Sequence, residues 1–256
     1  MEDEILFAGV EPGVPSDPEL PAVHEQLIVF ARELGELYRL ERSRSAELER
    51  VLASLQETYI ATMKSLAQVI EAKDLTTRGH LDRTQAYGLA LARRIDGSLV
   101  TAELGYGFFL HDICKVGIPE HILCKGGPLT TDEWEVMRTH PLVGAQIVEP
   151  IAFLAGAVDL IRHHHERFDG DGYPDGLKAE QIPLTARVFS VADSFDAMTS
   201  DRPYRGAMSI DRALSEIEVG AGTQFDPEVV RVFVGMVRDD PPEDDEAFQR
   251  ALANAL

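Results

Sequence analysis

Residues 24–70 restrict the fold most, because this stretch contains no proline and a single glycine, Gly35. Apolar side chains recur in it every three or four residues, at Leu27, Phe30, Leu34, Leu37, Leu48, Val51 and Leu55. That spacing places them along one face of an α-helix, with Glu41 and Arg44 interrupting the apolar seam. We therefore expect one long helix, or two helices in line, over 24–70.

Two interpretations of this helix stay open. In the first, it is a coiled coil that joins two copies of the chain as a homodimer through residues 24–70, or a stalk for a sensory domain. In the second, it is an amphipathic helix whose apolar face packs on the chain's own domain. The seam is too short to specify a partner, so the sequence does not decide between them.

The rest of the chain also has helical periodicity, and no stretch shows the alternation typical of a β-strand. Candidate helices cover 58–73, 80–96, 101–111, 131–147, 151–165, 184–198, 209–219 and 226–237. Two segments rich in glycine and proline, 115–130 and 168–183, are predicted loops, and long ordered loops tend to be functional. The predicted fold class is all-α, a helical bundle with an N-terminal helical extension.

Four parts of the chain follow from these patterns and from the distribution of charge. We expect an acidic, proline-rich flexible segment at 1–23, a helical extension at 24–57, the main helical domain at 58–238, and an acidic linker with a short C-terminal helix at 239–256.

Composition argues against several classes of protein. The formal net charge is −20, which disfavours DNA or RNA binding but leaves room for a small anionic substrate beside a metal ion. The two cysteines, Cys114 and Cys124, make no disulfide framework. No apolar run approaches the roughly 20 residues of a membrane span, and the N-terminus does not resemble a signal peptide. We expect a cytoplasmic protein without membrane contact.

Histidine and aspartate residues form the strongest chemical signal. His111 and Asp112 end an apolar stretch, GYGFFLHD, and pair an imidazole nitrogen with a carboxylate oxygen. This mixture of donors suits iron, manganese, zinc or cobalt better than calcium or magnesium. Further donors recur on other candidate helices, at His80, His140, His164, His165, Asp193 and Asp196.

Each of these residues alone has an ordinary structural explanation, such as a helix cap, a solvated turn or a buried ion-pair partner. Together they would place several metal-type donors on separate helices of one domain, which favours a metal centre. His24, His121 and His163 lie outside the pattern and are expected to be exposed or loop residues.

With these motifs in view, the chain resembles the HD-GYP family of cyclic di-GMP phosphodiesterases, a branch of the HD phosphohydrolases. The resemblance covers roughly residues 58–237 and includes His111-Asp112 and Gly172-Tyr173-Pro174. It extends to the stretches HDICKVGIPE (111–120), HHERFDGDGYPDGL (164–177), IPLTARVFSVADSFDAMTSDRPYR (182–205) and GTQFDPEVV (222–230). The implied fold is the HD-domain helical bundle.

The resemblance also implies a metal centre with Asp112 as the bridge between two metal ions, iron or manganese. Its ligands would be His80, His111, Asp112, His140, His164, His165 and Asp193. A third metal would need an additional glutamate shortly before His80, where this chain has Thr76, with Glu71 further upstream. Two metals are therefore favoured over three.

The implied reaction is hydrolysis of cyclic di-GMP to linear pGpG, with onward cleavage to GMP left open. A pair of metals can hold a bridging hydroxide near neutral pH, which would attack the phosphorus in line with the leaving 3′ oxygen. The expected catalytic residues are His111, Asp112, Lys115 and Asp196. Lys115 lies one turn after His111 if the helix continues, and Asp196 would act behind the ligands or on the leaving group.

Substrate contacts are predicted at Lys115, Gly172, Tyr173, Pro174, Arg187, Arg202 and Arg205. A guanidinium at Arg202 or Arg205 matches a phosphate or a guanine edge, and the alternative for this RPYR segment is a salt-bridged corner. The glycine-rich loop around Tyr173 would shape the substrate wall, dock a GGDEF-type cyclase domain, or only make turns. The sequence does not separate these roles.

The chain departs from the family pattern at three places. Cys114 replaces the glycine of HDIGK, DLTTRGH replaces DPYTxGH, and KGGPLT (125–130) replaces KPGKLT. None of these changes removes a predicted metal ligand, but a side chain at Cys114 would crowd the metals or add a redox-sensitive thiol. Two rival functions stay open: a low-turnover cyclic-dinucleotide-binding signalling protein, and an HD phosphohydrolase for another cyclic nucleotide.

Overall fold

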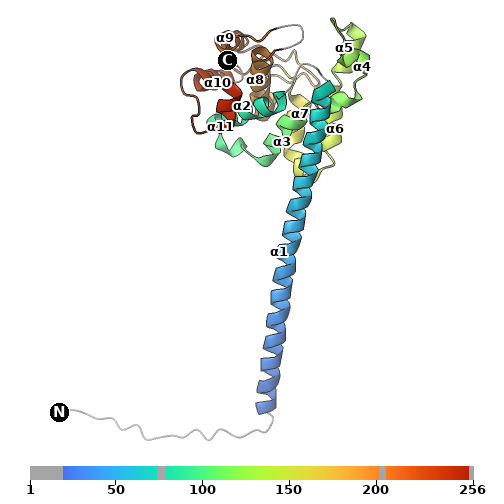
Figure 1. Cartoon of the computed structure of the whole chain (residues 1–256), viewed down its shortest axis with the longest axis vertical. Coiled ribbons are helices and arrows are strands. Elements are labelled where there is room, and N and C mark those ends of the chain that lie inside the picture. The colour runs from blue at the N-terminus through green and yellow to red at the C-terminus, as the bar shows by residue number, and fades with distance from the viewer. Residues whose placement is uncertain (1–19, 74–78, 202–205, 254–256) are drawn as a thin grey trace, which may run out of the picture. The chain divides into compact units, whose positions relative to one another are not determined.

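The computed structural model describes residues 20–73, 79–201 and 206–253, and Figure 1 labels the elements. The chain divides into two compact units, Met1–Thr58 and Tyr59–Leu256. Among the described residues, regular structure is helical apart from one isolated bridge between Ala221 and Phe225. The all-α prediction is therefore confirmed.

The α-helices are α1 (Leu20–Lys73), α2 (His80–Ile95), α3 (Ala102–Leu110), α4 (Glu120–Leu123), α5 (Thr131–Met137), α6 (His140–Val148), α7 (Val158–His163), α8 (Leu184–Thr199), α9 (Ile210–Val219), α10 (Pro227–Arg238) and α11 (Glu246–Ala253). Short 3₁₀ helices separate some of them, namely η1 (Gly97–Leu99), η2 (Ile113–Gly117), η3 (Ala152–Ala157) and η4 (Ala179–Gln181). Among the described helices, none combines the length and the apolar character needed to cross a membrane.

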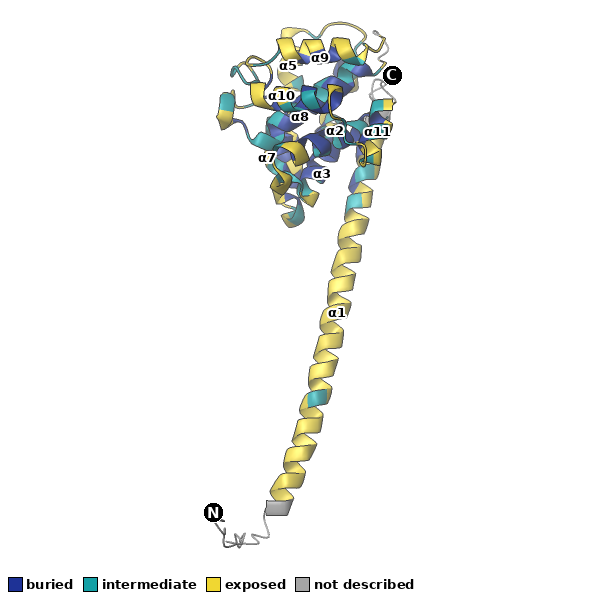
Figure 2. Cartoon of the chain, turned by 90° about the vertical axis from the view of Figure 1, so that its left-hand side faces the viewer, coloured by how far each residue is buried: buried dark blue, intermediate teal, exposed yellow. Residues whose placement is uncertain are grey.

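α1 is one continuous helix, so the stretch 24–70 forms one long helix and not two helices in line. In the first unit its described side chains are almost all exposed, as the yellow ribbon of Figure 2 shows, and Phe30 of the seam is 62% exposed. Within the second unit the same helix packs inward, with Met63 and Ala67 buried. The ring of Tyr59 meets that of Phe153 edge-on at a centroid distance of 5.6 Å.

The second unit is built around α2 and α8, whose facing sides supply much of the buried core. Tyr87 of α2 meets Phe195 of α8 edge-on with ring centroids 5.1 Å apart, and Phe195 meets Phe233 of α10 at the same separation. Each fully buried ring of this kind contributes about 1.5–3 kcal/mol through removal from water. A Cβ at Gly88 would lie 2.0 Å from the Phe108 ring, so the glycine allows α3 to lie close against α2.

The acidic C-terminal segment lies against α2. Asp240 accepts a hydrogen bond from Arg94 at 2.6 Å, and Asp245 accepts one from Arg93 at 3.0 Å. Phe248 of α11 is fully buried, with its ring centroid 5.7 Å from that of Tyr87. The last helix therefore completes the core behind α2.

Three predicted boundaries are corrected by the structure. The segment 131–147 forms α5 and α6, because Pro141 cannot donate a backbone hydrogen bond and favours the first turn of a new helix. The segment 151–165 begins as η3 before α7. The predicted loop 115–130 contains α4, whose four residues precede the Gly126–Pro128 cluster that dominated the sequence pattern.

Candidate metal centre

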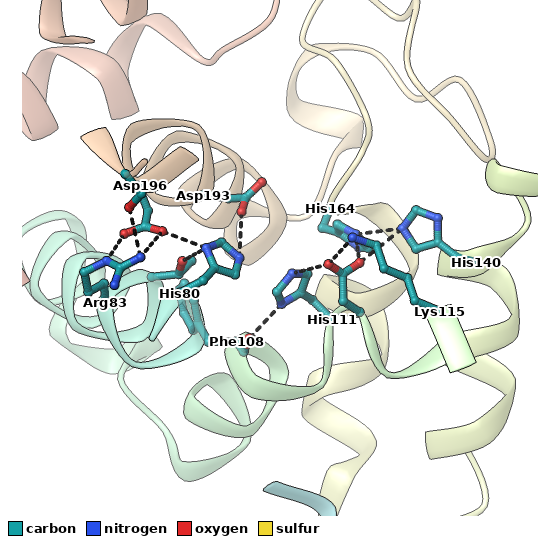
Figure 3. A network of polar contacts seen from close by, with 12 residues as sticks. His80, Arg83, Phe108, His111, Lys115, His140, His164, Asp193 and Asp196 are labelled. Carbon is teal, nitrogen blue, oxygen red and sulfur yellow. Dashed lines mark hydrogen bonds and ion pairs between the residues drawn. The ribbon is translucent and has the colours of Figure 1, made fainter. Parts of the chain in front are cut away.

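All seven predicted metal ligands fall into two adjoining groups. Figure 3 labels His80, His111, His140, His164 and Asp193 among them. The first group is Asp112, His140, His164 and His165, and the second is His80, His111 and Asp193. In each group one donor atom per residue lies within 4.8 Å of every other. The residues come from α2, α8, α6 and the ends of α3 and α7, so the helix packing brings donors from distant parts of the sequence together.

Asp112 lies between the two groups. Its Oδ2 is 3.1 Å from Nε2 of His111 in the second group. Its Oδ1 faces Nε2 of His140 at 3.5 Å and Nε2 of His164 at 4.0 Å in the first group. Oδ1 is buried without a hydrogen-bond partner, which is costly for a carboxylate unless a cation satisfies it. The donor set and this oxygen together fit a metal centre.

Three of the histidines are oriented by the same local contact. Nδ1 of His111, His140 and His164 donates to the carbonyl three residues earlier, that of Phe108, Met137 and Ile161, at 2.8, 2.7 and 2.8 Å respectively. A carbonyl can only accept, so Nδ1 carries the proton and Nε2 keeps its lone pair. Each Nε2 is thereby directed toward Asp112, which is the arrangement of a metal-ligating imidazole.

His80 is oriented by a carboxylate instead. Its Nδ1 donates to Oδ2 of Asp196 at 2.8 Å, and its Nε2 lies 3.3 Å from Oδ1 of Asp193. Asp196 is buried and in turn accepts from Nε of Arg83 at 2.5 Å. Arg83 also donates to Ser200 Oγ at 2.9 Å, so α2 and α8 hold this network between them.

The electrostatics of the donors suit a cation. Burial, together with the nearby histidines, holds the pKa of His164 well below its ordinary value, and burial lowers the pKa of His165 to about 3. Both imidazoles are therefore neutral, as metal ligands must be. Burial opposes ionisation of Asp193, but its contact with His80 outweighs this and lowers its pKa to about 2.

Two further donors, Asp112 and His80, have pKa values that are shifted by neighbouring charges. Burial opposes ionisation of Asp112, but Lys115 and His111 together hold its pKa well below the ordinary range. Burial lowers the pKa of His80, whereas the carboxylates of Asp193 and Asp196 outweigh it and raise the pKa to about 10. The two carboxylates therefore stabilise positive charge at His80, and metal binding there would release the proton of this imidazole.

Lys115 reaches the centre by a route that differs from the predicted one. α3 ends at Leu110, and η2 follows it in place of a further α-helical turn. The shorter 3₁₀ geometry still brings Nζ of Lys115 to 2.7 Å from Oδ2 of Asp112. The lysine is thus an ammonium donor at the edge of the donor groups.

The Gly172-Tyr173-Pro174 loop is attached directly to the histidines. A Cβ at Gly172 would lie 2.3 Å from the backbone nitrogen of Arg167, so only glycine allows this approach. The backbone N–H of Tyr173 donates to the carbonyl of His165 at 3.2 Å, and its ring stacks on His165 at a centroid distance of 4.8 Å. The loop glycine therefore has a packing role, and Tyr173 borders the donor groups.

Glu166, which follows the histidine run, holds the other end of this loop. It is 4% exposed, and its carboxylate accepts from the backbone N–H of Asp175 at 2.8 Å and of Leu177 at 3.1 Å. Pro174 is joined to Tyr173 by a cis peptide bond. No described contact places Pro174 against the donor groups.

The predicted arginine contacts are not brought to the centre in the described part of the chain. Arg187 donates to Asp226 Oδ2 at 2.5 Å and to the carbonyl of Ile182 at 3.0 Å. Its charge is neutralised in this pair between α8 and α10, so we do not assign it to substrate binding. Arg202 and Arg205 lie outside the described residues, as does Thr76, on which the number of metals was argued.

The Cys114 side chain packs against α6. A Cβ at Gly144 of α6 would lie 3.2 Å from its sulfur, so the thiol occupies space that this glycine leaves open. Burial, with the nearby charge of Asp112, raises the pKa of the thiol to about 12. With its pKa raised in this way, the buried thiol is poorly suited to redox chemistry.

Several residues of the site were missed by sequence reasoning. Arg83 had a detectable signal, because it lies three residues after His80 and so shares a helix face with it. Glu166 directly follows the histidine run, but its partners are backbone groups that no side-chain pattern reveals. Arg138, whose guanidinium lies 5.6 Å from the centre of the Tyr173 ring, carried no recognisable motif.

The fold and the paired donor groups define a helical protein with a candidate binuclear metal centre. A family model described as the HD domain matches residues 64–229. The chain therefore belongs to the HD domain family. This membership agrees with the placement of His111 and Asp112, the pair for which such domains are named.

Two curated relatives from Vibrio cholerae and one solved structure illustrate the similarity. A cyclic di-GMP phosphodiesterase is 38% identical over 220 residues, covering 80% of this chain and 45% of the relative. A 3′3′-cGAMP-specific phosphodiesterase is 34% identical over 235 residues, covering 89% of this chain and 51% of the relative. The chain thus spans about half the length of these relatives.

The solved structure supports the fold. It is an HDG"Y"P protein from Bdellovibrio bacteriovorus, with a TM-score of 0.50 and 19% identity, covering 70% of this chain and 60% of that one. Together these matches confirm the HD-GYP resemblance that the motifs indicated.

Proposed function

We propose that the chain is a metal-dependent phosphodiesterase that hydrolyses cyclic di-GMP to pGpG, with onward cleavage to GMP left open. The observation that carries the proposal is the position of Asp112, whose two carboxylate oxygens face different groups of metal-type donors. A carboxylate placed in this way is suited to joining two metal ions. The name of the 38% identical relative supports the choice of substrate.

The cofactor we propose is a pair of transition-metal ions, iron or manganese, since nitrogen and carboxylate donors are combined. His80, His111 and Asp193 would hold one ion, and His140, His164 and His165 the other, with Asp112 shared between them. Bound metals of this kind supply Lewis acidity and make water a stronger nucleophile near neutral pH. A third metal is less favoured.

The chain's own residues would position and stabilise the reacting phosphate. Lys115 ends beside Asp112, so its ammonium group can offset the charge that develops on the phosphoryl oxygens. Asp196 lies one contact further out and is buried behind His80. We assign it the task of orienting this imidazole, because it touches the ring and Arg83.

A second substrate is favoured by one specific observation. The 34% identical relative is named for 3′3′-cGAMP, which differs from cyclic di-GMP in one base. The donor groups described here would meet a phosphate in either molecule, so they do not distinguish the two. The slow-turnover binding protein has less support, because the predicted donors in the described chain are brought together.

We also propose a homodimer through residues 24–70. The apolar seam of α1 is exposed in the first unit, where Leu37 is 63% and Leu55 61% exposed, and a second copy would cover it. Sedimentation of the chain without residues 1–57 should show monomers that retain metal. Dimers of the shortened chain would locate the contact elsewhere.

Two further proposals concern the setting of the protein. The loop around Tyr173 is a candidate docking point for a GGDEF-type cyclase domain, because Gly172 and Glu166 hold its backbone in one shape. Co-purification that persists after Glu166→Gln would argue against this. The proposed location is the cytoplasm, and fractionation of cells that produce the tagged chain would test it.

The proposed reaction is tested by product analysis. Protein is loaded anaerobically with Fe(II), and separately with Mn(II), and incubated with cyclic di-GMP and 3′3′-cGAMP in parallel. Appearance of pGpG that depends on metal would support the proposal. Faster cleavage of 3′3′-cGAMP than of cyclic di-GMP would make 3′3′-cGAMP the preferred substrate. If both nucleotides stay intact although metal is bound, the chain is a binding protein.

A further inference from the structure

A row of stacked groups leads away from the donor groups toward the surface. The Tyr173 ring stacks on His165 with centroids 4.8 Å apart and planes inclined by 26°. The guanidinium of Arg138 lies 5.6 Å from the centre of the Tyr173 ring on its way to α5. The same guanidinium lies 5.9 Å from the Trp134 ring. The row therefore alternates aromatic and cationic groups, beginning at a proposed metal ligand.

The outer part of this row is accessible and carries positive charge. Trp134 is 44% exposed, and Arg138 is exposed as well. Within the described chain no carboxylate forms an ion pair with Arg138. Tryptophan and arginine are enriched where protein surfaces bind partners.

The chemistry of this row matches half of a cyclic dinucleotide. Such a molecule has two phosphates and two bases, and only one phosphate can be cleaved at a metal centre at a time. The remainder must rest on neighbouring groups. A guanidinium fork binds phosphate oxygens, and aromatic rings stack on nucleobases of any sequence.

We propose that Trp134, Arg138 and Tyr173 form a nucleotide rest, in which Arg138 contacts the phosphate that is not being cleaved and Trp134 stacks on a purine base. The inference rests on the proposed function, because it takes the cyclic dinucleotide as the substrate. It adds a recognition role for two residues outside the metal ligands and the Gly172-Tyr173-Pro174 motif. An alternative is that Arg138 only shields the Trp134 ring and stabilises α5.

The tryptophan provides a direct readout, because Trp134 is the single tryptophan of the chain. Mn(II)-loaded protein is mixed with cyclic di-GMP in a stopped-flow instrument, and tryptophan emission is followed before the first turnover is complete. Stacking of a purine on the indole should change the emission in a saturable way. This signal does not require hydrolysis.

Two variants and one control separate recognition from structure. Arg138→Met removes the charge, and Trp134→Phe reduces the stacking surface. Arg231→Met removes an exposed arginine of α10, whose partner is Glu228, and serves as the control. Each is assayed with cyclic di-GMP and with bis(p-nitrophenyl) phosphate, a diester without bases, and Trp134→Phe is also tested for nucleotide binding by equilibrium dialysis.

We expect the KM for cyclic di-GMP, and the half-saturating concentration where emission can be read, to rise about tenfold in Arg138→Met, and the KM to rise comparably in Trp134→Phe. Hydrolysis of bis(p-nitrophenyl) phosphate should remain near the wild-type rate in both, and Arg231→Met should behave as wild type.

Three outcomes distinguish failure of the nucleotide rest from failure of the proposed hydrolysis. If pGpG forms normally while tryptophan emission stays constant at saturating cyclic di-GMP, the nucleotide rest is wrong and the proposed function stands. If both diesters are affected equally by Arg138→Met, the residue is structural and the inference is again wrong. If emission changes saturably but no pGpG forms, the rest stands and the proposed hydrolysis fails.

Discussion

Asp196 accepts a hydrogen bond from Nδ1 of His80 at 2.8 Å, across the contact between α8 and α2. The two residues are separated by 116 positions in the chain, and both are buried. The contact leaves Nε2 of His80 facing Asp193 at 3.3 Å. Arg83 clamps the opposite side of Asp196, so the orientation of this imidazole depends on a carboxylate that does not itself face the donor groups.

Replacing that carboxylate should weaken metal binding without removing a ligand. In Asp196→Asn we expect metal affinity to fall about 10- to 100-fold, because partners behind a ligating histidine fix its tautomer and basicity. Titration of the stripped protein with Mn(II) measures this. Asp211→Asn, at an exposed position of α9, is the matched control. Equal affinities in both variants would remove the proposed orienting role.

Removing the shared carboxylate should have a larger effect. Asp112→Ala should abolish phosphodiesterase activity and reduce the bound metal, because one residue faces both donor groups. Elemental analysis of purified protein gives the metal content, and chromatography gives pGpG. Unchanged turnover in this variant would rule out a centre bridged by Asp112.

Replacing Lys115 should affect the rate of hydrolysis more than the amount of bound metal. In Lys115→Met we expect kcat to fall about 10²- to 10³-fold, the cost of losing one donor to developing charge, with metal content retained. Steady-state kinetics and elemental analysis on the same preparation test this. Loss of metal together with activity would instead assign the lysine, which lies 2.7 Å from Asp112, a structural role.

Glu166 should stabilise the loop that carries Tyr173. In Glu166→Gln an amide replaces the buried carboxyl group that accepts from two backbone N–H groups. We expect the free energy of unfolding to fall by about 1–3 kcal/mol. Urea denaturation compares it with Glu180→Gln, an exposed position in η4. Identical midpoints would show that the two hydrogen bonds add nothing measurable.

Acid should destabilise the metal-stripped protein through the buried histidines. The pKa of His165 is lowered to about 3 by burial, against about 6.5 when unfolded, so the unfolded chain binds the extra proton between these values. Stability is therefore fully present above about pH 6.5 and is lost as pH falls toward 3.

The corresponding measurement is urea denaturation of chelator-treated protein between pH 4.5 and 7. His165→Gln should reduce the slope of stability against pH by up to about 1.4 kcal/mol per pH unit, whereas His121→Gln, at an exposed position, should not. A slope that is the same in wild type and His165→Gln would contradict the assignment of His165 as a neutral imidazole in the folded chain.

Much of the fold could be predicted from local pattern. The proline-free run 24–70 is one helix, and the absence of alternating apolar residues correctly indicated an all-α protein. The break between α5 and α6 was missed, although Pro141 marks it, because the apolar spacing continues through it. Periodicity reports which face is buried, and it is insensitive to a change of helix axis.

The donor residues of the candidate site could be predicted from the sequence, whereas the groups that orient them could not. Residue types placed His140 and Asp193 in a set of candidate donors, the family resemblance implied their role as ligands, and the structure brings them into adjoining groups. The Nδ1 contacts to backbone carbonyls and the pairing of Arg187 with Asp226 depend on tertiary packing. Arg187 was assigned to the substrate because a sequence shows a charge but not the partner that neutralises it.

We propose that two metal ions joined by Asp112 make the chain a cyclic di-GMP phosphodiesterase. The most direct measurement adds Mn(II) stepwise to stripped protein and records both metal bound per chain and the rate of pGpG formation. We expect little activity at one bound equivalent of metal per chain and full activity at two. Intact cyclic di-GMP with two equivalents bound would contradict it.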